Sequence, residues 1–380
     1  MSGDRKAAAL ISCSEHYQHR LAVIDKCLQQ RGYDTIYITS DFDHTTKNVF
    51  TCSVPNCVQL HARPYQKNLS LDRILSHREF AKNVFDYLEK QPRIPDVVVA
   101  LIPPNFLAHY GAIFKKRHPE VTMIFDIFDM WPETFPSSKV KKVLAPVFSV
   151  WAWIRDHSLR KADFVTTECE LFRRMLNLPE KTSASIYLAA EPLPIPAIPI
   201  QLRQDGLDLC YLGAINNIIG ISEICSLLSQ LTKYRHVTLH IIGKGEREKE
   251  FIESAKAAGA QVVFYGPIFD DTKKQEIMSR CHFGLNIMKS SVCIGLTMKS
   301  VDFFRFGLPI INNIPADTHR LVVENGVGIQ LDEGCVKDIL AMSTTDFLRM
   351  RANVQRFFFD VLQMDAVLSK YHDLFDDILK

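Results

Sequence analysis

The sequence lacks the features that mark several large classes of protein. Its ten cysteines include no Cys-x-x-Cys pair, and the closest two, Cys52 and Cys57, are too widely spaced for a usual zinc knuckle. Reduced thiols in the cytosol are the simplest account of such scattered cysteines. The formal net charge is only +2, which argues against general affinity for nucleic acid. We therefore expect a cytoplasmic protein with no nucleic-acid partner.

Long hydrophobic runs are also missing. The longest apolar run, residues 144–154, has 11 residues and contains Pro146 and Ser149, so it is too short to span a bilayer. The first six residues lead directly into the strand-like residues 7–11, and we expect no signal peptide. Apolar residues make up 47% and charged residues 23% of the chain, as is ordinary for globular proteins. A length of 380 residues favours two domains.

Short apolar runs alternate with helical patterns through the first half of the chain. This repeated strand–helix order predicts an α/β fold with a doubly wound parallel sheet and right-handed crossovers. Ligands of such sheets bind beyond the carboxyl ends of the strands. The expected strands cover residues 7–12, 35–39, 96–102 and 122–127, and the expected helices cover 20–31, 71–90 and 106–116.

A proline-rich stretch interrupts this alternation. Residues 191–200 contain four prolines, which favour extended backbone and cannot continue a helix. The last 36 residues, 345–380, have the apolar spacing of an amphipathic helix that either caps the second domain or crosses back to the first. The alternation restarts between these segments, with expected strands over 208–213, 236–243, 261–266, 284–288 and 309–312 and helices over 222–231, 245–258, 271–281 and around Asp302. We predict two Rossmann-like domains, 1–190 and 207–345, joined by a linker at 191–206 and followed by helices at 346–380.

Residues 295–312 are the most informative segment. A turn of small residues presents Gly295, Thr297 and Lys299 at the start of a short helix, where free backbone N–H groups, a hydroxyl and an ammonium can converge on a phosphate. Alternatively, Lys299 is a solvated residue at the start of the helix, and the Gly-Leu-Pro sequence that follows only ends it.

Two further strand ends of the second domain, at 213 and 243, carry residues suited to the same ligand as the turn at 295. Taken one at a time, each is equally well explained as a simple turn. Together they lie on the edge where the fold binds its ligands, and they predict a site for a nucleotide that carries phosphate. We expect the base near Tyr265 and Gly266. The predicted donor-binding set is Gly213, Asn216, Asn217, Gly243, Lys244, Tyr265, Gly266, Gly295, Thr297, Met298, Lys299 and Asp302.

The first domain contains a second unusual group, directly after an expected strand. Asp126, Asp129, Trp131 and Glu133 are typical of a sugar-binding surface, where an indole packs on C–H groups and carboxylates accept hydroxyl protons. The alternative is a helix start with Pro132 in its first turn. His16 follows the first strand and completes the predicted acceptor-binding set. For the two aspartates at 41 and 43 we favour turn capping over metal binding.

Residues 137–161 combine basic residues with an apolar segment that contains two tryptophans. This combination suits an interfacial element on an anionic membrane, and it suits a partly buried core helix equally well.

Taken together, these features resemble the family 4 type of GT-B glycosyltransferases, in particular bacterial surface-polysaccharide enzymes with an Asp-x-Trp-Pro-Glu segment in the acceptor domain. The resemblance covers most of the chain and is carried by residues 40–44, 129–133, 211–217, 241–246 and 299–309.

The resemblance implies two Rossmann-like domains facing a central cleft and a C-terminal helix that crosses back to the first domain. It also implies transfer of a hexosyl or related sugar from a nucleotide-diphosphate donor to a hydroxyl of a lipid-linked glycan, with retained configuration, no cofactor and no essential metal. Lys299 would stabilise the leaving diphosphate, Asp302 would bind donor hydroxyls, and Asp129 and Glu133 would position the attacking hydroxyl. The protein would be peripheral at the inner face of the cell membrane.

Two departures from the family pattern keep other functions open. The family usually has two glutamates with seven residues between them; the second falls on Asp302, but the first falls on Ile294. Its usual Arg and Lys near the first donor-domain strand are replaced by residues 214–217. A non-catalytic GT-B subunit that supports a catalytic partner, and a sugar-nucleotide epimerase, are therefore the alternatives.

Overall fold

The computed structural model describes residues 5–14, 18–135, 142–193 and 205–379. The chain divides into two compact units. The first contains Met1–Ala189 and Val367–Lys380, and the second contains Ala190–Ala366.

The first unit contains a seven-stranded parallel sheet in the order β5-β2-β1-β6-β7-β8-β9. Strand β6 is buried along its whole length and consists of β-branched and other apolar residues, as expected of a strand covered on both faces. The strands are β1 (Ala7–Ile11), β2 (Asp34–Ser40), β5 (Cys57–Leu60), β6 (Val97–Ile102), β7 (Thr122–Ile127), β8 (Phe164–Thr167) and β9 (Ser183–Ser185), and β3 (Phe42–Asp43) and β4 (Asn48–Val49) form a separate hairpin.

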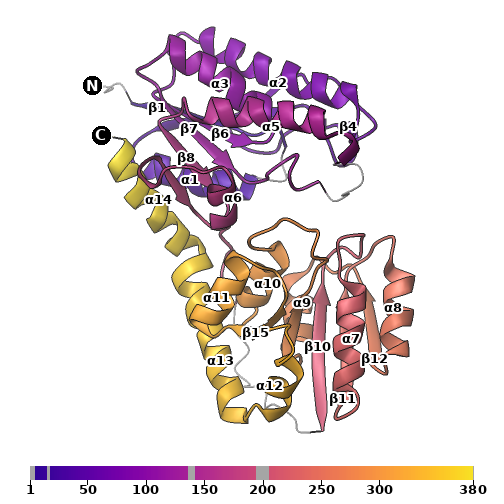
Figure 1. Ribbon diagram of the computed structural model, residues 1–380. Helices are drawn as coiled ribbons and strands as arrows, with labels where there is room; N and C mark the ends of the chain where they lie inside the picture. Colours follow the sequence, from indigo (N-terminus) through magenta and orange to yellow (C-terminus); the bar gives the residue numbers. More distant parts are fainter. Residues whose placement is uncertain (1–4, 15–17, 136–141, 194–204, 380) are drawn as a thin grey trace. The chain divides into compact units, whose positions relative to one another are not determined.

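Helices cover both faces of this sheet. One face carries α2 (Leu71–Glu89), α3 (Asn105–Arg117) and α5 (Ala145–Leu159), which pack against one another in that order (Figure 1). Helix α1 (Gln18–Gln30) packs on β1 and β2. The short helices α6 (Glu170–Met175) and η2 (Glu180–Thr182) flank β8 and β9.

The second unit contains a six-stranded parallel sheet in the order β12-β11-β10-β13-β14-β15. Both sheets therefore reverse their strand order next to their first strand, and the prediction of two doubly wound sheets is confirmed. The elements are β10 (Gly206–Leu212), α7 (Ile221–Leu231), β11 (His236–Ile242), α8 (Glu248–Ala257), β12 (Gln261–Gly266), α9 (Asp271–Met278), β13 (Phe283–Asn286), α10 (Met298–Arg305), β14 (Ile310–Asn312), α11 (Asp317–Asn325), β15 (Gly328–Gln330) and α12 (Cys335–Ala341).

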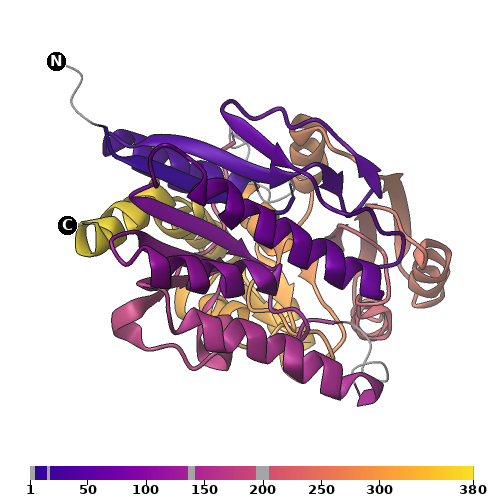
Figure 2. The same ribbon diagram turned by 90° about the horizontal axis from the view of Figure 1, so that it is seen from above.

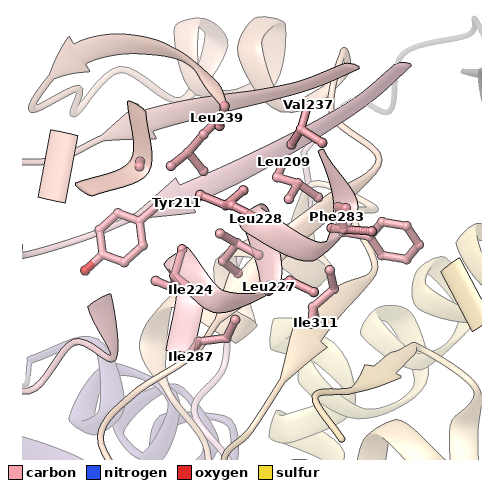
Figure 3. Packing of buried hydrophobic residues seen from close by; sticks show 14 of the residues in the cluster. Leu209, Tyr211, Ile224, Leu227, Leu228, Val237, Leu239, Phe283, Ile287 and Ile311 are labelled. Carbon is pink, nitrogen blue, oxygen red and sulfur yellow. The ribbon is translucent and has the colours of Figure 1, made fainter. Parts of the chain in front are cut away.

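One face of α7 supplies much of the core of this unit. Ile224, Leu227 and Leu228 are spaced three and four residues apart and lie against Leu209 and Phe283 of the sheet (Figure 3). Full burial of each side chain contributes about 1.5–3 kcal/mol relative to an exposed position.

The C-terminal region differs from the predicted division. Helix α13 (Thr344–Phe357) belongs to the second unit, since Phe347 is fully buried in its core. A π-helical turn, η3 (Phe358–Leu362), separates α13 from α14 (Met364–Ile378). Only the part from Val367 onward belongs to the first unit, so the prediction that residues 346–380 pack back as a whole is wrong.

Helix α14 lies beside α1 (Figure 2), and polar contacts hold the two together. Arg31, just after α1, donates hydrogen bonds to the carbonyl oxygen of His372 at 2.6 Å and to Asp376 at 2.7 Å. His372 also contacts Gln30 at 2.7 Å. The predicted crossing of the chain back to the first domain is thus confirmed for its last helix.

Candidate functional site

In the second unit the strand order reverses between β10 and β13, and ligands of doubly wound sheets bind beyond such a point. The predicted donor-binding residues lie in the loops after β10, β11 and β12 and at the start of α10. The backbone brings these loops together. Gly213 donates its N–H to the Ile242 carbonyl at 2.9 Å, and Gly243 donates to Gly266 at 2.8 Å.

Glycine is required at position 243 by this packing. Its φ is +153°, and a Cβ there would lie 1.9 Å from the Gly213 carbonyl oxygen. Gly213 itself has φ +118°, and a Cβ there would meet no atom within 4 Å. Gly243 is therefore explained by loop packing, whereas Gly213 borders open space.

The two asparagines that follow shape the loop. Asn216 Oδ1 accepts a hydrogen bond from the Ile218 N–H at 3.1 Å. Asn217 Nδ2 donates to Glu246 Oε1 at 2.5 Å, and Lys244 is exposed. These contacts hold the backbone of the loop after β10, and so its N–H groups, at the carboxyl edge of the second sheet.

Thr297 caps helix α10. The residue is 3% exposed, and its hydroxyl donates to Asn286 Oδ1 at 2.7 Å and accepts from the Ser300 N–H at 3.1 Å. The prediction that this hydroxyl binds phosphate is therefore wrong. The N–H groups of Met298 and Lys299 lie in the first helical turn, where no intrahelical acceptor exists.

A buried polar network holds the turn before α10 in place. Asn286 donates to Asn312 at 2.8 Å, and Asn312 donates to Gln330 at 3.0 Å. The Gly295 carbonyl accepts from both the N–H and the hydroxyl of Thr318, at 2.9 and 2.6 Å. Because the network joins three neighbouring strands, it fixes the start of α10 relative to the sheet.

Lys299 connects α10 to the loop after β10. Its Nζ lies 5.0 Å from the centre of the Tyr211 ring, and the Tyr211 hydroxyl donates to the Ala214 carbonyl at 2.8 Å. Burial lowers the pKa of Lys299 to about 8. Among the described residues no hydrogen-bond acceptor or carboxylate pairs with this ammonium. A half-buried ammonium beside open N–H groups suits a phosphate ligand.

Asp302 and Tyr265 lie at the same edge of the sheet. Burial raises the pKa of Asp302, one helical turn after Lys299, and its neighbour Arg305 pairs instead with Asp271 at 2.9 Å. The Tyr265 ring stacks on His240 at 5.9 Å, with a hydrogen bond of 2.9 Å between its hydroxyl and Nδ1. Tyr265 is 37% exposed, so part of its ring is open to a ligand.

The first unit requires corrections to the predicted acceptor site. Asp126 is fully buried and accepts two hydrogen bonds of 2.8 Å from Arg20, which also donates to the Ile186 carbonyl. This carboxylate has no surface left for a sugar. The prediction that Asp126 binds the acceptor is wrong, and its role is to hold α1 against the sheet.

Glu133 and Trp131 are also occupied by protein contacts. Glu133 accepts hydrogen bonds of 2.7 and 3.0 Å from the buried Arg155. The Arg73 guanidinium lies 4.7 Å above the Trp131 ring, whose centre is 4.8 Å from that of Trp151. Both residues stabilise the segment after β7. The Glu133 carboxylate, which binds Arg155, and the face of the Trp131 indole that Arg73 covers are therefore not open to a sugar, and the predicted sugar-binding role is corrected for both.

Asp129 remains a candidate. It accepts a hydrogen bond from Thr134 at 2.6 Å, and in the described part of the chain it has no ion-pair partner. Burial raises its pKa, which makes the carboxylate a better proton acceptor. His16 lies outside the described residues.

The two aspartates near the hairpin support the turn and the strand end beside it. Asp43 accepts from the N–H of Thr45 and the hydroxyl of Thr46, both at 2.8 Å. Asp41 accepts from the N–H of Ala62 at 2.9 Å. Within the described ranges, no three His, Cys, Asp or Glu side chains are close enough to hold a metal ion together.

Glu168 was not predicted. It follows β8 directly, as Asp129 follows β7, and β7 and β8 are neighbours in the sheet. Burial raises its pKa to about 7, with Arg20 lowering it and Asp126 and Asp129 raising it. The signal in the sequence was an acid placed directly after an apolar strand.

Helix α5 and the residues just before it expose an apolar stripe. Val143, Val147, Val150 and Trp153 recur every three or four residues and are 79%, 49%, 60% and 62% exposed. The preceding residues 137–141 lie outside the described residues. Of the helices that the structure describes, none is long and apolar enough to cross a membrane.

No protein-family model matches the chain, and no curated protein matches its sequence. Solved structures do match its fold. The N-terminal domain of Candida albicans trehalose-6-phosphate phosphatase is 11% identical, with coverage of 99% of this chain and 98% of that one and a TM-score of 0.67. Anabaena HepE in complex with UDP and glucose is 11% identical, with coverage of 98% and 99% and a TM-score of 0.64. The lipopolysaccharide outer core galactosyltransferase WaaB is 15% identical, with coverage of 98% and 99% and a TM-score of 0.59.

These matches extend over the whole chain and define its fold class. Two doubly wound parallel domains with a C-terminal helix returning to the first make up the GT-B fold. The chain has this fold.

Proposed function

We propose that this protein is a glycosyltransferase of the GT-B class that transfers a sugar from a nucleotide diphosphate to a hydroxyl group. The observation that carries the proposal is the unpaired, half-buried Lys299, placed beside the open N–H groups of α10 and the loop after β10. HepE, which has the same fold, has been solved with UDP-glucose, and this supports a nucleotide-sugar donor.

Donor chemistry is assigned to the second unit. Lys299 and the N–H groups of α10 stabilise the charge of the diphosphate as it leaves, an electrostatic contribution that is strong in a site shielded from water. Asp302 accepts hydrogen bonds from donor hydroxyls. The nucleotide base lies near Tyr265, whose exposed face can stack on it.

Acceptor chemistry is assigned to the first unit. Asp129 accepts a hydrogen bond from the attacking hydroxyl, and Glu168 lies at the neighbouring strand end with a pKa near neutrality. We further propose that the reaction retains configuration, needs no essential metal and belongs to a family 4 type enzyme that transfers a hexosyl or related sugar.

We propose a lipid-linked glycan of surface-polysaccharide synthesis as the acceptor. The exposed apolar stripe of α5, flanked by Lys142, Arg160 and Lys161, supports peripheral contact with an anionic membrane. We propose that the protein lies in the cytoplasm at the inner face of the cell membrane, where such contact would form.

The test is turnover with a panel of UDP- and GDP-sugars and a lipid-linked acceptor. Lys299→Met should reduce kcat/KM at least tenfold, and Asp129→Asn should reduce kcat at least a hundredfold with little change in donor affinity. If both variants turn over like the native protein, the proposal fails.

Two observations favour a second function. Ile294 stands where the family has its first acid, and the Thr297 hydroxyl is committed to capping. A non-catalytic subunit that supports a catalytic partner would bind acceptor and show no stabilisation by any nucleotide-sugar. Thermal-shift titration separates the two functions.

A further inference from the structure

A group of cationic and aromatic side chains lies beside the carboxyl edge of the first sheet, and of these only Arg73 has been described so far, as the cation above the Trp131 ring. Lys47 lies in the β3–β4 hairpin, Tyr65 between β5 and α2, and Arg73 and His77 one turn apart on α2. The Lys47 ammonium is 4.3 Å from the centre of the Tyr65 ring, and the Tyr65 and His77 rings are 6.1 Å apart.

Neither cation forms a salt bridge within the part of the chain that the structure describes. Lys47 donates to the His44 carbonyl and to Asn68 Oδ1, and Arg73 donates to the Asn68 carbonyl at 2.8 Å. These acceptors are neutral, and among the described residues no carboxylate lies within salt-bridge distance of either cation. Burial lowers the pKa of Lys47 and the charge of Arg73 lowers it further, while the charge of Asp43 has a smaller opposing effect. Two neighbouring unpaired cations attract an anion.

Hydrogen-bonding capacity in this group is also unused. Tyr65 Oη, Arg73 Nε and His77 Nδ1 are buried and make no hydrogen bond of good geometry in the described structure, although Arg73 lies near enough to the Tyr65 hydroxyl to lower its pKa, which burial raises. Buried polar groups without a partner destabilise the folded protein, and native proteins contain few of them. Lys47 has a φ of 62°, which is unfavourable for a residue other than glycine. Buried polar atoms without good hydrogen bonds and an unfavourable backbone conformation in the same small region indicate a ligand-binding site.

The charged groups nearby do not supply this ligand. Asp43 accepts hydrogen bonds within the hairpin turn. Burial raises the pKa of Asp129, and Arg73 lowers it without forming an ion pair with this carboxylate. His77 stays neutral, because burial lowers its pKa well below the usual value. It therefore contributes a hydrogen bond and no charge.

We propose that Lys47, Tyr65 and Arg73 form a subsite for a phosphoryl group of the acceptor. A planar guanidinium, an ammonium and a phenol offer several donors to one tetrahedral phosphate, a combination well suited to it. The assignment of this phosphoryl group to the acceptor rests on the proposed glycosyltransferase function. The group is either the diphosphate of a lipid-linked glycan or the phosphate ester of a soluble sugar.

Anion binding is measured first, without turnover, in the Lys299→Met background so that the donor site does not contribute. Isothermal titration with a hexose 6-phosphate and with pyrophosphate at low salt should give saturable binding. Arg73→Gln should weaken it at least tenfold, whereas Arg78→Gln, an exposed arginine on the same helix, should leave it unchanged. Equal affinity of the two variants would overturn the proposal.

The variant Tyr65→Phe distinguishes a loss of anion binding from a loss of folding. Removing an unpaired buried hydroxyl should leave the unfolding midpoint unchanged or raise it, while weakening anion binding about threefold or more. A lower midpoint with unchanged binding would assign the hydroxyl a structural role and overturn its place in the subsite.

Acceptor kinetics then identify the source of the phosphoryl group. Arg73→Gln should raise the acceptor KM for either the lipid diphosphate or the sugar phosphate and leave the donor KM unchanged. If the native protein binds the anions but shows no transfer, the proposed function fails while the subsite stands. If it transfers sugar and Arg73→Gln leaves both acceptor KM values unchanged, the subsite fails alone.

Discussion

Replacing Lys299 with methionine distinguishes a phosphate-binding role from a structural one. The change keeps an unbranched apolar side chain of similar length and removes the ammonium that lies over the Tyr211 ring. A hydrogen bond from a charged group contributes about 1.5–3 kcal/mol, and each 1.4 kcal/mol changes affinity tenfold. We therefore expect Lys299→Met to bind a nucleoside diphosphate about 10- to 150-fold more weakly than the native protein.

The pH dependence of the same titration provides an internal check. Because the pKa of Lys299 is about 8, affinity for the diphosphate should fall as the pH rises through that value, and the fall should be absent in Lys299→Met. Stability should change in the opposite direction. The pKa is lower in the folded protein than its usual 10.5, so the unfolded chain binds more protons between pH 8 and 10.5, and native stability should rise over that window.

The assay is isothermal titration with UDP and GDP, combined with urea unfolding. Lys299→Arg should retain most of the binding, and Lys256→Met, which removes an exposed lysine of α8, should change neither affinity nor stability. The reasoning is refuted if Lys299→Met binds as tightly as Lys256→Met, or if it loses more than about 2 kcal/mol of stability, since losses of that size signal a core defect.

Three further predictions concern the first unit. Arg20→Met leaves the buried Asp126 without its ion-pair partner and should lower the free energy of unfolding in urea by about 3–5 kcal/mol. Arg5→Met, at an exposed ion pair, should lower it by less than about 1 kcal/mol. Similar losses in the two variants would contradict the argument from burial. Glu168 keeps its proton to about pH 7 in the folded protein, so native stability should fall as the pH rises from 4.5 to 7. Glu168→Gln should flatten this dependence of stability on pH. If the dependence is unchanged in the variant, another group is responsible for it. Val150→Asp should reduce sedimentation with anionic vesicles severalfold without lowering the unfolding midpoint, and unchanged sedimentation would count against membrane contact by α5.

The alternation of apolar runs and helical patterns was enough to predict both sheets. Strand β7 was predicted with the ends it has, residues 122–127, because a strand buried on both faces reads as a continuous apolar run between polar turns. Short edge strands such as β9 (Ser183–Ser185) carry no such pattern and were missed. Helix α13 was assigned to the wrong unit, since spacing reveals an apolar face but not the surface it packs on.

The convergence of the donor loops was predictable, because the carboxyl ends of parallel strands share one edge. Which polar atoms remain free was not predictable. Asp126 is occupied by Arg20, which lies 106 positions away, and Thr297 by Asn286, which lies 11 away. Such pairings depend on three-dimensional position rather than on residue type or spacing. The acids and hydroxyls of a strand end can therefore be recognised from the sequence, while their roles depend on the partners that the fold provides.

Titration with a panel of nucleotide-sugars tests the central claim most directly. If the glycine-rich edge and Lys299 form a donor site, at least one UDP- or GDP-sugar will raise the unfolding midpoint in a saturable manner, and the same sugar will have no such effect on Lys299→Met. A panel that leaves the native midpoint unchanged at millimolar concentrations would contradict the account.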